Sequence, residues 1–143
     1  LGAADFVGIT CALTDETRHL IDAEHLALMK PTAYLINVAR GPIVDQDALT
    51  VALRERRIQG AALDVFEQEP VDPVDPILGL DNVIVTPHCM CWTDEFFRNN
   101  AESAFRSVTA VAAGRTPTYV VNRDVLQRPQ LRSRLLDQHQ EGP

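Results

Sequence analysis

"AYLINVARGPIVDQDALTVALRERRIQGAALDVF", residues 33–66, predicts one strand–helix–strand unit. Residues 33–38 and 61–66 are short apolar runs that are typical of buried strands. Residues 45–57 between them predict a helix, and Asp45 is suited to cap its first turn. The apolar face of this helix would consist of Leu49, Val51, Ala52 and Leu53. Two strands joined by a helix in this way are expected to be parallel neighbours in one sheet.

The same alternation continues on both sides of this unit. Residues 5–11 predict an earlier strand, and an amphipathic segment starts at Asp22 and stops at Pro31. Downstream, a proline-rich loop leads into a strand at 83–88. A long helix then starts at Thr93 or Asp94 and ends at Ala113, closed by Gly114. The order predicts an α/β fold with a parallel sheet and helices against its faces.

The remainder of the chain is less regular. Residues 118–122 are expected to form a short extended piece. Residues 123–143 are polar and rich in Arg and Gln, which indicates a tail or an element that needs a partner surface.

Composition excludes several classes of function. The net charge of −7 and the pI of about 4.9 argue against nucleic acid or an anionic membrane as a partner. No apolar run approaches the roughly 20 residues of a membrane span, and the first residues do not resemble a signal peptide. The odd count of three cysteines favours a reducing compartment, so a cytoplasmic location is expected. His88, Cys89 and Cys91 are spaced too tightly for the usual zinc sites, and no metal is expected.

Three polar residues follow separate predicted strands. Arg40, Glu69 and His88 all lie beyond a strand's carboxyl end, where open parallel sheets bind ligands. Arg40 could grip a carboxylate through two hydrogen bonds. Glu69 could fix the tautomer of His88 and make it a general acid and base for a 2-oxo or 2-hydroxy acid. On the residues alone, a surface ion pair for Arg40 and a structural role for His88 remain open.

The stretches "ALMKPTAYLINVARGPIVDQDAL", "GAALDVFEQEP" and "NVIVTPH" closely resemble the D-isomer-specific 2-hydroxyacid dehydrogenases. The resemblance covers about residues 4 to 122. It implies a partial Rossmann-like parallel sheet flanked by helices, with a long C-terminal return helix. It also implies that residues 1–114 are the second half of an NAD(P)-binding domain that includes this helix. Residues 115–143 would then belong to, or dock on, the substrate domain.

The resemblance also implies roles for individual residues. Arg40 would clamp the substrate carboxylate, Glu69 would be the partner of the catalytic histidine, and His88 would donate and accept the proton. Glu67, in the variable part of the same motif, is the weaker candidate for that partner. The implied cofactor contacts, to NAD or NADP, are Cys11, Ala12, Val38, Ala39, Arg40, Asp64 and His88. Asp64 would bind the nicotinamide carboxamide, and Val38 and Ala39 would let the ring approach the backbone.

The implied reaction is reversible hydride transfer between nicotinamide C4 and C2 of a D-2-hydroxy or 2-oxo acid, in a full-length protein that is a homodimer. The sequence lacks the G-x-G-x-x-G motif that cradles a pyrophosphate, which the family carries upstream of this region. The isolated chain is therefore expected to be an inactive fragment that binds NAD weakly or not at all. A cofactor-sensing protein that resembles the C-terminal-binding transcriptional corepressors is the alternative function.

"HCMCWTDE", residues 88–95, replaces the small residues that usually follow the family's histidine. Cys89, Met90 and Cys91 are expected to pack at the entry of the long helix. Trp92 either lines the substrate pocket or anchors that helix.

Overall fold

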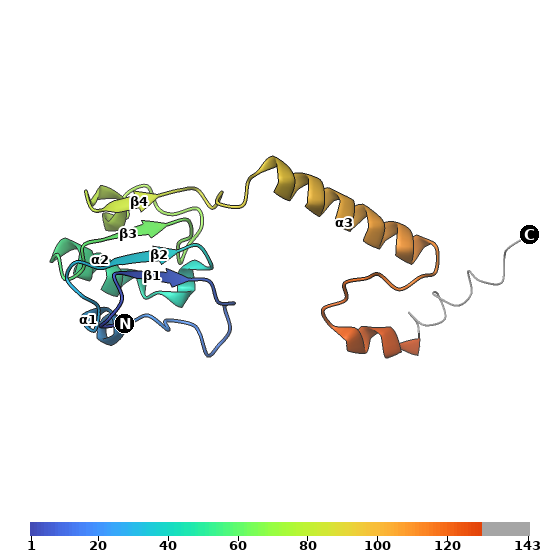
Figure 1. The fold of residues 1–143 in the computed structure, drawn as a ribbon, viewed down its shortest axis with the longest axis horizontal. Helices are drawn as coiled ribbons and strands as arrows, with labels where there is room; N and C mark the ends of the chain where they lie inside the picture. The colour runs from blue at the N-terminus through green and yellow to red at the C-terminus, as the bar shows by residue number, and fades with distance from the viewer. Residues whose placement is uncertain (130–143) are drawn as a thin grey trace, which may run out of the picture. The chain divides into compact units, whose positions relative to one another are not determined.

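The computed structural model describes residues 1–129, and its central feature is a four-stranded parallel sheet (Figure 1). The sheet has the order β1-β2-β3-β4, with strands Phe6–Ile9, Tyr34–Asn37, Gly60–Leu63 and Val83–Val85. Gly8 pairs with Ile36, Ile36 with Ala62, and Ala62 with Ile84. This architecture confirms the predicted α/β fold, in which sequence order and spatial order coincide.

Two helices connect the first three strands. Helix α1 (Ala23–Ala27) follows Asp22, whose carboxylate accepts a hydrogen bond from the His25 amide. Helix α2 (Gln46–Arg54) follows Asp45, which accepts from the Ala48 amide at 2.9 Å, so the predicted cap is confirmed. The helix is shorter than the expected 45–57 because Arg56 takes a left-handed conformation with φ 56°.

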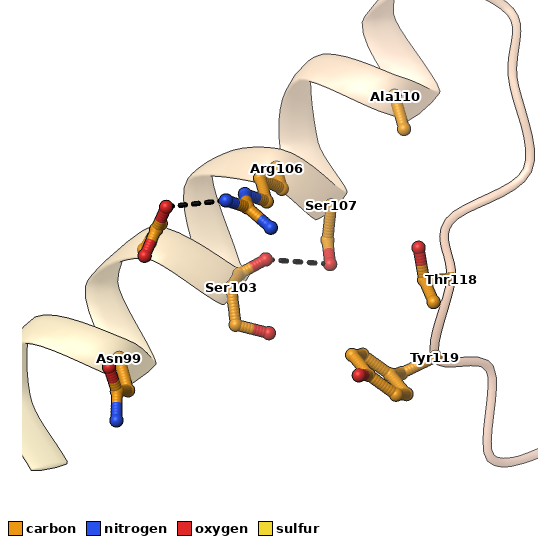
Figure 2. Close-up of a pocket in the computed structure, with 8 residues that line it drawn as sticks. Asn99, Ser103, Arg106, Ser107, Ala110, Thr118 and Tyr119 are labelled. Atoms are coloured by element: carbon orange, nitrogen blue, oxygen red, sulfur yellow. Dashed lines mark hydrogen bonds and ion pairs between the residues drawn. The ribbon is translucent and has the colours of Figure 1, made fainter.

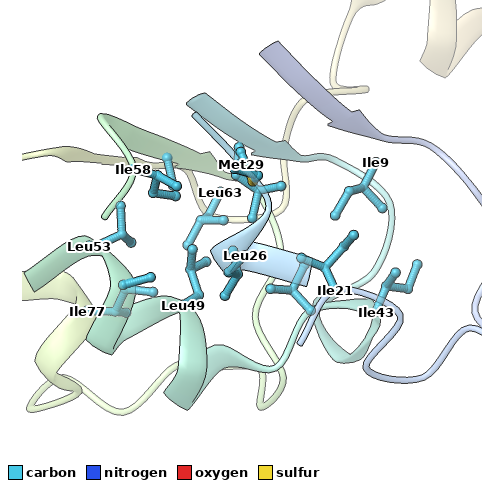
Figure 3. Close-up of a cluster of buried hydrophobic side chains, with 14 of the residues drawn as sticks. Ile9, Ile21, Leu26, Met29, Ile43, Leu49, Leu53, Ile58, Leu63 and Ile77 are labelled. Carbon is cyan, nitrogen blue, oxygen red and sulfur yellow. The ribbon is translucent and has the colours of Figure 1, made fainter. Parts of the chain in front are cut away.

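The hydrophobic core lies between the sheet and helices α1 and α2 (Figure 3). It consists of Ile9, Ile21, Leu26, Met29, Ala33, Leu35, Ile43, Val44, Leu49, Ala52, Leu53, Ile58, Ala61, Leu63, Phe66 and Ile77. Each large aliphatic side chain buried here contributes about 1.5–3 kcal/mol. Val51, which was expected on the apolar face of α2, is instead 40% exposed.

Side chains of the alternate strand register point to the other face of the sheet. Phe6 and Tyr34 stack there with ring centroids 5.6 Å apart, and Ile84 is exposed. Within residues 1–90 this face is therefore apolar and open.

All four strands end earlier than the sequence predicted. Strands expected at 5–11, 33–38, 61–66 and 83–88 stop after Ile9, Asn37, Leu63 and Val85. The last residues of each apolar run leave the ladder and build the loops at the carboxyl edge. Two short 3₁₀ helices, η1 (Gly41–Ile43) and η2 (Pro76–Gly79), were not predicted, and each has a proline in its first turn.

The chain divides into two compact units, Leu1–Met90 and a second unit that begins at Cys91. The second unit contains helix α3 (Asp94–Ala112), capped by Thr93, and Gly114 ends it with φ 66°. None of the α3 side chains is buried within the second unit. The expected domain boundary at residue 114, and the assignment of α3 to the cofactor domain, therefore stay predictions.

Other features of the second unit differ from expectation or add to it. Trp92 packs near Phe97 at the start of α3, with ring centroids 6.3 Å apart. A hollow of about 230 Å³ lies between α3 and residues 118–119, with Ser103, Arg106 and Tyr119 in its walls (Figure 2). Residues 118–122, expected as a short extended piece, belong to no strand or helix.

The expected polar tail begins with a 3₁₀ helix, η3 (Arg123–Gln127), and the part of the tail at 130–143 lies outside the described residues. No helix within residues 1–129 has the length and apolarity to cross a membrane.

Candidate active site

The loops that leave the four parallel strands lie at one edge of the sheet and carry every predicted site residue. Cys11 and Ala12 are exposed after β1, and Val38, Ala39 and Arg40 follow β2. Asp64 and Glu69 follow β3, and His88 follows β4. This edge is where ligands bind in open α/β sheets.

Glu69 and His88 form the contact that the sequence predicted. Nδ1 of His88 lies 2.7 Å from Oε2 of Glu69, while Oε1 of Glu69 accepts a hydrogen bond from the Phe66 amide at 3.0 Å. Both side chains are partly exposed, at 43% for His88 and 37% for Glu69. Within the described residues, Nε2 of His88 has no hydrogen-bond partner.

The environment keeps Glu69 ionised. Burial raises the pKa of Glu69, but hydrogen bonds from His88 and the Phe66 amide act in the opposite direction. The charge of His88, when it is protonated, and the charge of Arg40 also favour the carboxylate, and the net pKa of Glu69 lies below the ordinary value. An ionised Glu69 accepts the proton on Nδ1, so Nε2 is the nitrogen available for proton exchange.

Asp64 holds the turn that carries His88. His88 has φ 54°, a left-handed conformation that is uncommon for a residue with a side chain. Oδ1 of the buried Asp64 accepts from the Thr86 hydroxyl at 2.5 Å and from the Cys89 amide at 2.8 Å. Oδ2 accepts from the Met90 amide at 3.1 Å. The Asp64 carboxylate therefore binds residues that precede and follow His88 in the sequence.

The pKa of Asp64 reflects two opposing effects. Burial raises it, whereas the hydrogen bonds from Thr86, Cys89 and Met90 and the charge of His88 lower it. The hydrogen bonds prevail, and the pKa lies below the ordinary value.

Arg40 is placed by its neighbours rather than by an ion pair. The side chain of Asn37, which is 1% exposed, donates to the Arg40 carbonyl at 3.0 Å and accepts from the Ala39 amide at 3.1 Å. The guanidinium is exposed and donates to the Ala39 carbonyl. In residues 1–129 no carboxylate forms a salt bridge with Arg40, so its charge contributes to the local field without being neutralised.

Gly41 brings the loops after β2 and β3 into contact. A Cβ added to Gly41 would lie 1.9 Å from the Phe66 carbonyl carbon and 2.4 Å from the Glu67 nitrogen. Only glycine allows this approach, so the chain next to Arg40 packs directly on the turn that carries Glu69.

A pocket of about 490 Å³ opens beside the Glu69–His88 pair. Its walls are Asp64, Phe66, Glu69, Pro70, Val71, Pro87 and His88. An apolar wall with a few polar groups suits a small ring or a short acid. The other predicted site residues lie at the same edge of the sheet but outside these walls; they are Cys11, Ala12, Val38, Ala39 and Arg40. Across the described residues, no three His, Cys, Asp or Glu side chains are grouped to hold a metal ion.

Sequence reasoning missed four residues that build this site. Asn37, Gly41 and Thr86 carry the turn contacts described above, and Gln46 binds the loop after β3. A buried asparagine at a strand end and a glycine directly after Arg40 were the available signals. The bond between Thr86 and Asp64 joins residues 22 positions apart, so no local pattern could reveal it.

A parallel sheet of this order, with its polar groups at the carboxyl edge, defines a Rossmann-like α/β domain. The chain belongs to the D-isomer specific 2-hydroxyacid dehydrogenase family, whose NAD binding domain matches residues 1–90.

Individual relatives agree with this assignment. Glyoxylate reductase from Thermofilum pendens is 51% identical over 127 residues, which cover 89% of this chain and 38% of that protein. A D-isomer specific 2-hydroxyacid dehydrogenase from Xanthobacter autotrophicus Py2, solved with NADPH, has a TM-score of 0.73 at 39% identity, covering 87% of this chain and 51% of that one. D-lactate dehydrogenase from Lactobacillus jensenii, solved with NAD+, gives 0.76 at 35% identity, covering 84% and 40%. The chain thus spans about two fifths of the curated relative.

Proposed function

We propose that this chain provides the catalytic edge and the nicotinamide end of an NAD(P)-dependent D-2-hydroxyacid dehydrogenase. The reaction is reversible hydride transfer between nicotinamide C4 and C2 of a D-2-hydroxy or 2-oxo acid. The contact between Glu69 and His88 beside the pocket is the observation that carries this proposal. An imidazole with one nitrogen fixed by a carboxylate and the other free is suited to proton exchange near neutral pH.

In this proposal, His88 moves the proton. During reduction of a 2-oxo acid, Nε2 gives its proton to the oxygen that becomes the hydroxyl, and the bond between that oxygen and C2 becomes single. In the oxidative direction, Nε2 takes the proton back. Glu69 stabilises the charged imidazole and keeps the ring in one orientation through its 2.7 Å contact.

Arg40 would bind the substrate carboxylate. Its planar guanidinium can form two parallel hydrogen bonds, and within the described residues no salt bridge competes for it. The loop that carries Arg40 packs on the turn that carries Glu69, and this arrangement would align C2 of the bound acid with His88.

The donor set fits the nicotinamide end of the cofactor, which supplies or accepts the hydride when bound. Oδ2 of Asp64 accepts one hydrogen bond and keeps a free lone pair that could take the carboxamide. Val38 and Ala39 would lie against the ring, and Cys11 and Ala12 beside the adenosine. The sequence has no glycine-rich cradle for the pyrophosphate, so that end of the cofactor would need other residues.

Because a relative is named glyoxylate reductase, we propose that the substrate is a small 2-oxo acid, and glyoxylate is the first substrate to test. We further propose that the full-length protein is a homodimer.

The function can be tested in a chimera in which this chain replaces the matching region of the Thermofilum pendens glyoxylate reductase. The assay follows oxidation of NADH and NADPH with glyoxylate, hydroxypyruvate and pyruvate. We expect turnover with at least one acid and loss of turnover on His88→Ala. A folded, cofactor-binding chimera without turnover on any 2-oxo acid would contradict an enzymatic role and favour the cofactor-sensing alternative.

A further inference from the structure

Glu67 has no part in the proposed chemistry, yet it is bound from three directions. Its Oε1 lies 3.0 Å from Nε2 of His19 and accepts a hydrogen bond from the Gln46 amide at 2.9 Å. In return, the Glu67 amide donates to Oε1 of Gln46 at 3.0 Å. Gln46 also donates from Nε2 to Asp75 at 2.8 Å. The reciprocal bonds join the first residue of α2 to the loop after β3.

These bonds lie beside the turn that carries Glu69. Glu67 lies between Phe66, whose amide binds Oε1 of Glu69, and Glu69 itself. The Phe66–Glu67 backbone packs on Gly41, directly after Arg40. The loop that carries Glu69 is therefore fixed at Gly41 and at the start of α2, within two residues of the proposed catalytic carboxylate.

We propose that Gln46 and Glu67, braced by His19, are positioning residues that hold the turn 66–69 in the conformation in which Glu69 meets His88. The catalytic meaning of this inference rests on the proposed function, but the positioning itself does not. His19 supports the pair because its own amide donates to the Pro42 carbonyl at 2.8 Å, which ties its loop to the segment after Arg40.

A simple surface ion pair explains the arrangement less well. Side chains of His19 and Glu67 are 43% and 34% exposed, and exposed pairs contribute about 0–1 kcal/mol. The reciprocal Gln46–Glu67 bonds, however, satisfy a free amide at the helix start and a loop amide together. A carboxylate at a helix N-terminus is also favoured by the helix dipole. These contacts specify geometry, whereas an exposed ion pair does not.

The pKa of Glu69 tests positioning because two explanations predict opposite signs. If Glu67 acts only through its charge, Glu67→Ala removes a neighbouring negative charge and lowers the pKa of Glu69 further. If Glu67 holds the turn, the same substitution weakens the hydrogen bonds from His88 and Phe66, and the pKa of Glu69 rises. We expect the rise, measured by ¹³C NMR titration of the side-chain carboxyl in the 143-residue chain.

Matched variants separate geometry from charge and from loss of fold. Gln46→Ala changes no charge and should also raise the pKa of Glu69. Glu67→Gln keeps an acceptor for the Gln46 amide but removes the negative charge, so it should leave the pKa of Glu69 unchanged or slightly lower. Glu55→Gln, at an exposed glutamate paired with Arg57, should leave it unchanged. His88→Ala gives the value for a Glu69 that has lost its partner.

Hydrogen exchange gives an independent readout. The Phe66 amide is bonded to Glu69 and to neither Gln46 nor Glu67, so its exchange reports the turn indirectly. We expect about tenfold faster exchange of this amide in Gln46→Ala, with the amides of β2 unchanged. An unchanged or lowered pKa of Glu69 in Gln46→Ala, together with unchanged Phe66 exchange, would overturn the inference. Neither readout uses turnover, so an inactive enzyme would refute the proposed function and leave this result standing.

Discussion

Nδ1 of His88 lies 2.7 Å from Oε2 of Glu69, although the two residues are 19 positions apart and follow different strands. The second oxygen of Glu69 is bound to the Phe66 amide, so the carboxylate cannot rotate away without losing a backbone contact. The orientation of the imidazole is therefore set by the main chain beyond β3.

Replacing His88 by alanine should remove the proposed proton donor of the reaction. In an active polypeptide that contains this chain, we expect turnover to fall by about 10²–10⁴, with cofactor affinity nearly unchanged. Steady-state kinetics and cofactor titration check this. His25→Ala is the matched control because His25 also contacts a carboxylate, that of Asp22, at 2.8 Å. Near-normal turnover in the His88 variant would remove His88 from the mechanism.

Arg40→Lys should weaken substrate binding while keeping the charge. Lysine cannot form the two parallel hydrogen bonds of a guanidinium, so we expect the KM for the 2-oxo acid to rise about tenfold or more. Arg57→Lys, at an exposed arginine paired with Glu55, is the control. A KM that stays the same in both variants would mean that Arg40 does not contact the acid.

Stability should depend on pH through Asp64. The pKa of Asp64 is depressed in the folded chain, so its contribution is complete above the ordinary carboxyl pKa and is lost as the pH falls through the folded value. We expect Asp64→Asn to lower the free energy of unfolding at pH 7 by about 1–3 kcal/mol and to flatten its acid dependence. Urea unfolding between pH 7 and pH 3 measures both. Asp15→Asn, in an exposed turn, should leave the pH dependence as it is.

Gly41→Ala tests the contact between the two loops. The new Cβ would overlap the Phe66 carbonyl group, which is backbone and cannot move aside cheaply. We expect a loss of about 3 kcal/mol or more in the free energy of unfolding, measured by urea denaturation. Gly79→Ala has no atom within 4 Å of its added Cβ and serves as the control. Equal stability of the two variants would show that the loops can separate.

The isolated chain should bind NAD weakly or not at all. It carries the residues proposed to bind the nicotinamide end but no glycine-rich loop for the pyrophosphate, which holds much of the negative charge of the dinucleotide. Isothermal titration calorimetry with NADH and NADPH checks this prediction. Micromolar affinity would contradict it and would require a phosphate site elsewhere in the chain.

The sequence predicted the layout of the fold well because hydrophobic periodicity and helix caps are local signals. Asp45 caps α2 as predicted, Thr93 is one of the two residues expected at the start of α3, and α1 follows Asp22, where an amphipathic segment was expected to start. Strand ends were predicted too far downstream, because Val65 and Phe66 are buried without belonging to the sheet ladder. Burial alone cannot distinguish a strand from a packed loop.

The candidate site was predictable only in part. The positions of Glu69 and His88 after neighbouring strands allowed their contact to be foreseen, and it is present. The supports of the site could not be foreseen, because they join distant residues, such as Gln46 to Glu67 and Thr86 to Asp64. Such pairs depend on how loops pack, which no periodic pattern encodes.

The double use of Glu69 has a consequence for protein engineering. A designer who transplants only this glutamate and histidine into another scaffold would transfer the functional groups without their alignment. The Phe66 amide that binds Oε1 of Glu69 belongs to the same short turn, so residues 66–69 are the smallest segment that would carry the proposed partner of His88 with its alignment. Its recipient would also need a glycine opposite the turn, as Gly41 is here.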